Sequence, residues 1–302
     1  MRLIINHHGH FQYDRDVQAS ENWVHLQPPF TPCQTVIHHT LQITPDAQDL
    51  KHLQDQFGNP CTHWHLRQPY NALTVETFSE VVTWVLPFQQ SSVSWETTQT
   101  MQNIKEVAPY LDASSLVPIG DAFAKYAKGS FRAELSLAEA AIDLCQRIKQ
   151  DFKYEPGSTR FDTPADEVLA NRRGVCQDFA HVLIACFRSL GLAASFVGGY
   201  LLKPTPPEQA QFFGPELLHA WVRLFIPDLT EHPCQGWLHL DPTNLCYNLG
   251  SPGENYIQLA VGRDFDDVPP LTGNVQGGGA FRRDVRITVE PVVLVNPEDS
   301  VS

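Results

Sequence analysis

The hydrophobic pattern of this 302-residue chain changes its period near Met101, and this change limits the folds open to it. Before that point, residues 73–78 alternate apolar and polar side chains at period two, as a strand with one buried face does. After it, residues 136–148 carry apolar side chains three and four positions apart, which is typical of a helix. Strand-like segments return from Ser195 onward. The order strands, helices, strands predicts an α+β fold.

The same pattern divides the chain into three parts. We predict an N-terminal antiparallel β-sandwich domain over residues 1–100, a connecting segment over 101–129 and a core over 130–302, with a final strand near 285–289. Residues 55–59, Asp-Gln-Phe-Gly-Asn, form a turn between two strands. The connecting segment is too apolar for a free linker, so we expect it to pack across the core and to hold the two domains together.

Two helices of the core are well defined by their sequence. Ser136 and Glu139 have the spacing of a capping box in front of the first helix. The second helix opens at Cys176, carries an apolar stripe through Leu190 and ends at Gly191, a residue suited to the left-handed position after a helix. We expect this helix to pack on an antiparallel sheet.

Composition and charge exclude several classes of function. The formal charge of −13 disfavours nucleic acids and anionic membrane surfaces. No segment reaches the about 20 apolar residues of a membrane span, and no secretory signal is visible, so we expect a cytoplasmic protein. The seven cysteines form no C-x-x-C pair, which indicates free thiols, at least one of them available for chemistry.

Cys176 has the placement that a nucleophilic thiol requires. A helix N-terminus stabilises the thiolate, and Gly174 permits a tight turn into the helix. His219 opens one predicted strand and Asp241 ends another, so neighbouring strands would bring a base and its orienting acceptor to one edge of the sheet. Spacing alone also fits a buried structural thiol and a turn-forming Asp.

Three sequence blocks around these residues resemble the transglutaminase-like superfamily. The blocks are Arg-Gly-Val-Cys-Gln-Asp-Phe-Ala over 173–180, Leu-His-Ala-Trp-Val over 218–222, and Gly-Trp-x-x-x-Asp-Pro-Thr-Asn over 236–244. The resemblance is closest to bacterial members with their own N-terminal β domain, and it extends to residues 55–59, 154–159 and 262–271. It implies a papain-like core with Cys176 as nucleophile, His219 as base and Asp241 as orienting residue. Leu218 stands where the family often has Ser, which predicts altered packing beside the base.

The resemblance implies acyl transfer on amide bonds through a thioester, without a cofactor. Water as acceptor gives a peptidase or amidase, which we favour, and an amine gives a transamidase; a non-enzymatic binding scaffold is the alternative. The expected partner is a protein or peptide substrate, and the sequence indicates no oligomeric state. The backbone N–H of Cys176 is the expected first donor of an oxyanion hole.

Four further residues are expected to contact the substrate: Gln177, Asp178, Trp221 and Arg263. Arg263 has two interpretations, a clamp for a substrate carboxylate or a structural network with Asp264 or Asp267.

No metal site is predicted. Cys61, His63 and His65 alternate on one face of a strand, a spacing compatible with a metal, but a polar strand face explains them more simply. Zinc held by Cys176, His219 and Asp241 is disfavoured relative to a nucleophile with its base. Gly277–Gly279 lacks the Lys-Ser/Thr of a phosphate loop and is expected to be a flexible loop.

Overall fold

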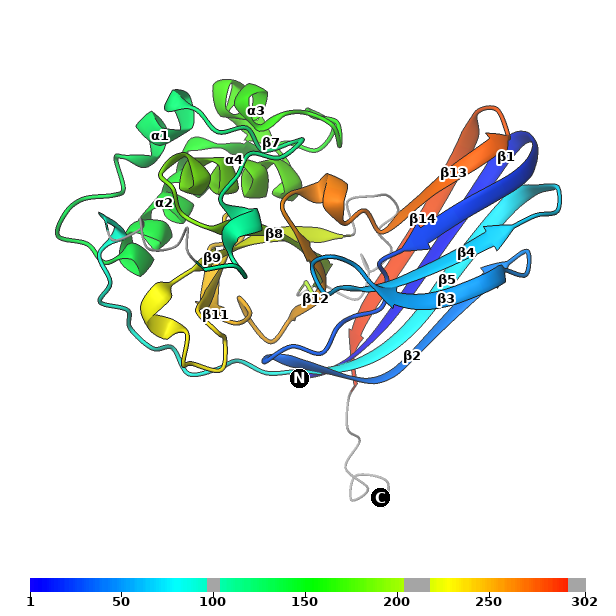
Figure 1. Ribbon diagram of the computed structural model, residues 1–302, viewed down its shortest axis with the longest axis horizontal. Coiled ribbons are helices and arrows are strands. Elements are labelled where there is room, and N and C mark those ends of the chain that lie inside the picture. Colours follow the sequence, from blue (N-terminus) through cyan, green and yellow to red (C-terminus); the bar gives the residue numbers. More distant parts are fainter. Residues whose placement is uncertain (97–103, 204–217, 293–302) are drawn as a thin grey trace, which may run out of the picture.

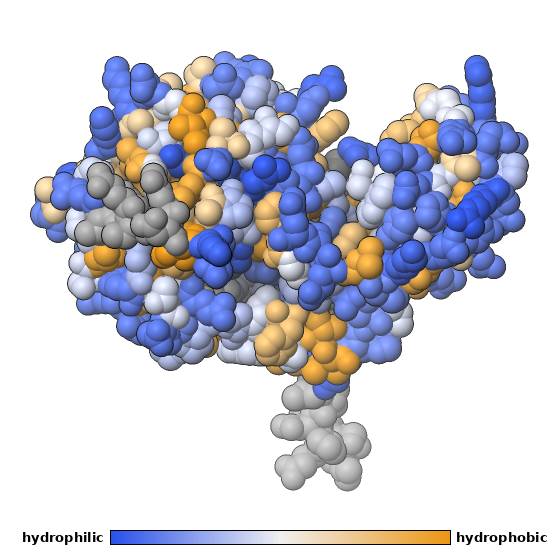
Figure 2. Space-filling view, viewed as in Figure 1, coloured by the Kyte–Doolittle hydropathy of each residue, from blue (hydrophilic) through white to orange (hydrophobic). Residues whose placement is uncertain are grey.

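The computed structural model describes residues 1–96, 104–203 and 218–292 and confirms the predicted α+β class. Helices lie on one side of a five-stranded core sheet, and a larger sheet forms the other end of the molecule (Figure 1). Polar residues cover most of the face shown in Figure 2, and apolar residues gather on it only in small groups. No helix among the described residues is long and apolar enough to span a bilayer.

The N-terminal sheet is organised around one long strand. In hydrogen-bonding order its strands are β2 (Gln34–Thr44), β5 (Tyr70–Thr83), β1 (Arg2–Val24), β4 (Pro60–Leu66) and β3 (Gln48–Gln54). The pairing of β1 with β5 is irregular between Gln12 and Val17, and β1 changes partners beyond this point. Inward side chains from both halves of β1 and from β4 share one apolar cluster. The predicted sandwich is therefore built from one continuous sheet.

Two strands from the end of the chain also belong to this sheet. β13 (Leu271–Gly277) pairs with the second half of β1, and β14 (Phe281–Pro291) pairs with its first half. The strand predicted near 285–289 is present within β14. Its predicted place in the core is wrong, because β14 belongs to the N-terminal sheet. Period-two alternation identifies a strand with one buried face, not the sheet that the strand joins.

In the part of the chain that the structure describes, the core has four helices on an antiparallel sheet. Its helices are α1 (Asp121–Ala127), α2 (Leu137–Asp151), α3 (Ala165–Asn171) and α4 (Cys176–Ser189). Its sheet has the order β11 (Cys246–Leu249), β10 (Trp237–Asp241), β9 (His219–Phe225), β8 (Ala194–Leu201) and β12 (Tyr256–Gly262). A short parallel pair, β6 (Lys153–Tyr154) and β7 (Arg173–Gly174), precedes α4, and 3-10 turns occur at Ala108–Tyr110, Pro227–Leu229 and Phe265–Asp267.

Both helices defined in the sequence are confirmed. The Ser136 side chain accepts from the Glu139 N–H, and the Glu139 carboxylate accepts from the Ser136 N–H, which completes the capping box of α2. α4 ends before Gly191, which has a φ of 76°. Nearly every residue of α4 is buried, because the other helices cover its outer side while its inner side packs on β8 and β9 (Figure 1).

The described part of the connecting segment packs on the core, as predicted. Tyr110, Val117 and Phe123 are buried in the same apolar cluster as α2 and α4. Arg188 of α4 donates to the carbonyl oxygens of Tyr110 and Asp112, which fixes the path of the segment. The Tyr110 ring also lies 6.0 Å from that of Phe57, in the turn predicted over residues 55–59.

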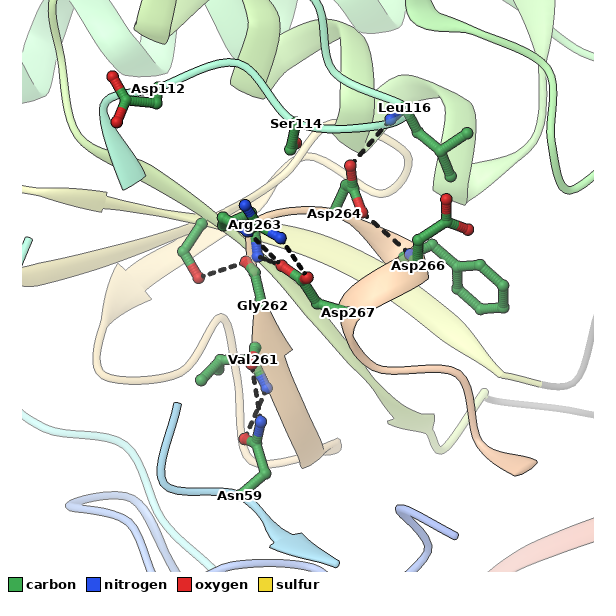
Figure 3. A network of polar contacts seen from close by, with 12 residues as sticks. Asn59, Asp112, Ser114, Leu116, Val261, Gly262, Arg263, Asp264, Asp266 and Asp267 are labelled. Carbon is green, nitrogen blue, oxygen red and sulfur yellow. Dashed lines mark hydrogen bonds and ion pairs between the residues drawn. The ribbon is translucent and has the colours of Figure 1, made fainter. Parts of the chain in front are cut away.

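The N-terminal domain contacts the core at the strand that edges the core sheet. The side-chain amide of Asn59 donates to the Val261 carbonyl at 2.8 Å and accepts from the Val261 N–H at 2.8 Å (Figure 3). Gln34 makes the same pair of bonds to Gln258, at 2.9 and 2.9 Å. Two amide side chains therefore satisfy backbone groups of β12 that would otherwise lack partners in the sheet.

Candidate active site

The turn into α4 places Cys176 at the first position of a buried helix. A Cβ at Gly174 would lie 2.5 Å from Asp178 Oδ2, so only glycine fits beneath this carboxylate. Asp178 Oδ2 accepts from the Val175 N–H at 2.7 Å and from the Thr159 hydroxyl at 2.6 Å. Burial raises the pKa of the Asp178 carboxyl in spite of these two bonds. Asp178 thus caps the helix that presents the thiol.

The Cys176 side chain is 9% exposed. Its Sγ lies 4.0 Å from the Leu218 carbonyl oxygen, one residue before His219. Cys176 also contributes, through a hydrogen bond and its charge, to the raised pKa of His219. The structure therefore brings together the helix start and the strand start that the sequence analysis paired.

His219 and Asp241 form a buried pair at adjacent strand ends. His219 Nε2 lies 2.7 Å from Asp241 Oδ2, and both side chains are almost inaccessible to solvent. Burial alone would lower the pKa of His219, but the hydrogen bonds to Asp241 and Cys176 and the charges of both groups raise this pKa to about 10. Burial would raise the pKa of Asp241, yet its hydrogen bonds, first of all that of His219, lower it. The pair therefore favours an imidazolium beside a carboxylate.

Asp241 has further donors that sequence reasoning did not single out. The Tyr256 hydroxyl donates to Asp241 Oδ2 at 2.7 Å, and the Asn244 amide donates to the same oxygen at 2.8 Å. The backbone N–H groups of Thr243 and Asn244 donate to Oδ1 at 2.7 and 3.2 Å. Asn244 follows Asp241 within one sequence block, so the sequence could have identified it as a partner of Asp241. Tyr256 lies on another strand, and nothing in its local sequence identifies it.

A surface pocket of about 240 Å³ opens beside the imidazole. Its lining consists of Lys149, Tyr154, Lys203, His219, Thr243 and Asn244. Two ammonium groups and no carboxylate occur among these lining residues, although the chain as a whole is acidic. Among the described residues, the lining of this pocket therefore has a charge opposite to the net charge of the protein.

The four residues expected to contact substrate lie in different surroundings. Trp221 is fully buried, stacks on His219 with 6.1 Å between ring centroids, and donates from Nε1 to His239 Nδ1 at 3.0 Å. Asp178 is 1% exposed and caps α4. Neither side chain is accessible to a substrate. Trp221 packs against His219, and Asp178 holds the start of the helix that carries Cys176.

The other two of these residues are partly accessible but already have partners. Gln177 Nε2 donates to the Phe161 carbonyl at 2.8 Å. Arg263 holds Asp267 through Nε and Nη2 at 2.9 and 2.8 Å, the structural network that the sequence left as one of two interpretations (Figure 3). This ion pair raises the pKa of Arg263.

Family models match two parts of the chain. Residues 124–242 match the model of the transglutaminase-like superfamily, and residues 3–82 match the model of the bacterial transglutaminase-like N-terminal region. The first match spans Cys176, His219 and Asp241, and the second covers most of the N-terminal strands.

Relatives and a solved structure agree with these matches. An uncharacterized protein of Mycobacterium tuberculosis is 35% identical over 279 residues, covering 90% of this chain and 87% of the relative. One from Mycobacterium leprae is 29% identical over 291 residues, covering 95% and 98%. A crystal structure from Cytophaga hutchinsonii, described as a "Putative Cysteine Protease", has 18% identity and a TM-score of 0.71 over 98% of this chain and 92% of that one. By sequence and by fold, this chain belongs to the transglutaminase-like superfamily, with the N-terminal region of its bacterial members.

Proposed function

We propose that the protein is a cysteine-nucleophile enzyme that hydrolyses amide bonds of a protein or peptide, with Cys176, His219 and Asp241 as its catalytic residues. The observation that carries this proposal is the buried His219–Asp241 pair, 2.7 Å apart, beside a thiol at the start of a helix. Membership of the superfamily and the fold shared with the protein from Cytophaga hutchinsonii support it.

In this proposal each group has its own step. Because His219 Nε2 faces Asp241, its Nδ1 is the nitrogen left for the Cys176 thiol. Sγ attacks the amide carbonyl carbon, and the developing oxyanion meets the backbone N–H of Cys176. The imidazolium gives its proton to the departing amine, which leaves a thioester on Cys176. His219 then takes a proton from water, the hydroxide attacks the thioester, and the thiolate leaves with the acid as product.

Transamidation uses the same thioester with an amine in place of water. We favour water as the acceptor, because water reaches any site that does not exclude it. Adding a primary amine to a reaction with a peptide amide distinguishes the two: hydrolysis yields free acid, and transamidation yields the amine adduct.

A thiol-reactive probe tests whether the site is an enzyme or a binding scaffold. We expect one cysteine, Cys176, to be labelled rapidly at about pH 6–7, because the imidazolium and the helix N-terminus stabilise its thiolate. Asp241→Asn should slow this labelling. Equal labelling of Cys176 in both proteins, at the rate of an ordinary exposed thiol, would contradict the proposal.

A further inference from the structure

A second group of metal-ligating side chains lies in the N-terminal domain, outside the candidate active site. Glu21 on β1 is the direct register partner of His65 on β4, and His63 lies two residues before His65 on the same strand. The side chains of these residues lie on the outer face of the sheet, and the side chain of Trp64 lies on the opposite, buried face. One ligand atom from each of Glu21, His63 and His65 lies within 4.8 Å of the other two.

The distances fit a shared cation. Glu21 Oε1 lies 2.9 Å from His63 Nε2 and 3.6 Å from His65 Nε2. Ligands bound tetrahedrally at ordinary zinc distances are about 3.4 Å apart, between these two values. Small side-chain rotations therefore suffice to place all three atoms around one ion.

His65 shows that hydrogen bonding alone does not explain the group. Its Nε2 is beyond hydrogen-bond distance of Glu21, and its Nδ1 is buried without a hydrogen-bond partner among the described residues. Asp49 Oδ2 lies 3.9 Å from this Nδ1, on the side where ligating histidines commonly have a carboxylate that orients the ring. His63 is held between the rings of Trp23 and His65, with centroids 4.9 and 4.8 Å away.

The predicted alternation of Cys61, His63 and His65 did not identify this set. Cys61 is buried and does not belong to the group, and Glu21, about forty residues earlier in the chain, takes its place. Two cations offset the negative charge of the carboxylates around the group. Arg67 pairs with Asp49, and the exposed Lys51 is the register partner of His63. One carboxylate and two imidazoles remain directed at one point.

We propose that Glu21, His63 and His65 bind one divalent first-row transition-metal ion, such as Zn²⁺, and thereby fasten β1 to β4. Two imidazoles and one carboxylate are a donor set suited to such ions rather than to Ca²⁺ or Mg²⁺. Coordination positions on the solvent side remain for water. This site is independent of the proposed amide hydrolysis.

The test uses the full chain, dialysed against a chelator and titrated with Zn²⁺ by calorimetry and by thermal unfolding. We expect one equivalent to bind and to raise the melting temperature, because the ion binds the folded state. Glu21→Gln and His65→Gln should each weaken binding by at least about tenfold and reduce the thermal shift. His8→Gln is the matched control, since His8 on the same strand pairs with Glu76 at 2.9 Å, but no third metal-ligating side chain completes a group with this pair among the described residues.

Co²⁺ distinguishes this site from the seven thiols. We expect a Co²⁺ spectrum without the intense thiolate-to-metal band, unchanged by Cys176→Ala. Three results would overturn the inference: no binding, a thiolate band that accompanies the bound equivalent, or Zn²⁺ affinities of Glu21→Gln and His65→Gln equal to that of His8→Gln. Melting of each metal-free variant beside the parent shows that the variants fold, and labelling of Cys176 reports on the other site separately.

Discussion

Replacement of Asp241 by Asn tests the candidate active site most directly, because it removes one charge and changes little volume. Asp241 Oδ2 accepts from His219, Asn244 and Tyr256, and Oδ1 accepts from two backbone N–H groups. An asparagine must place its NH₂ group at one of these two positions. At either position the NH₂ group, which can only donate, would face groups that also donate hydrogen bonds.

The structure gives the size of the effect on stability. With the NH₂ at the Oδ2 position, the Tyr256 hydroxyl can rotate to accept, but the N–H groups of His219 and Asn244 lose their acceptor. With the NH₂ at the Oδ1 position, two backbone N–H groups lose theirs. Each unsatisfied buried donor costs about 1–3 kcal/mol, so Asp241→Asn should lower the free energy of unfolding by about 2–6 kcal/mol.

The same change should alter reactivity and its pH dependence. The parent's His219 pKa of about 10 lies above the ordinary value, so its contribution to stability is complete below about pH 6.5 and is lost as the pH rises towards 10. Without the carboxylate, burial lowers the pKa of His219, and this loss of stability at alkaline pH should disappear. Turnover should fall by about 10²- to 10⁴-fold.

Urea unfolding between neutral and alkaline pH, together with the rate of Cys176 alkylation against pH, measures both effects. Tyr256→Phe is the control, because it removes one hydrogen bond to Asp241, worth about 1.5–3 kcal/mol, and keeps the charge. It should lose stability but retain the alkylation profile of the parent. If Asp241→Asn also retained that profile, Asp241 would not set the state of His219, and the proposed roles would be wrong.

Three further outcomes are expected. Cys176→Ala should abolish turnover and change the free energy of unfolding by less than about 1.5 kcal/mol, checked by urea titration; residual turnover would assign the chemistry elsewhere. All seven cysteines lie in the described residues, and Cys246 is the one that is not buried; mass spectrometry after brief alkylation at about pH 6–7 should nevertheless find Cys176 modified well before it, and comparable modification would contradict the proposed activation of Cys176. A fragment of residues 130–302 should be insoluble, because it lacks β1 and the buried part of the connecting segment; a soluble fragment as active as the full chain would refute this.

Local features were predictable from the sequence, and partners distant in the chain were not. The capping box of α2 and the start of α4 at Cys176 depend on residues within one helix, so their spacing was sufficient. The pairing of β14 with β1 joins residues 268 to 288 positions apart, and alternation carries no information on such pairing.

The same distinction holds within the candidate site. His219 and Asp241 were found because each lies in a recognisable sequence block. Tyr256 was missed because it reaches Asp241 only through the neighbour relations of the sheet. Glu21 was missed for the same reason, since it meets His65 only through the register of β1 with β4.

The pairing of β1 with β14 has a consequence for synthesis of the chain. The first half of β1 leaves the ribosome early, but one of its two neighbours is made only with residues 281–291. Until then one edge of β1 has exposed backbone N–H and C=O groups, which can pair with other chains. Neither domain therefore reaches its final form before nearly the whole chain is available, so the two domains should fold together, and the nascent protein should need protection against association.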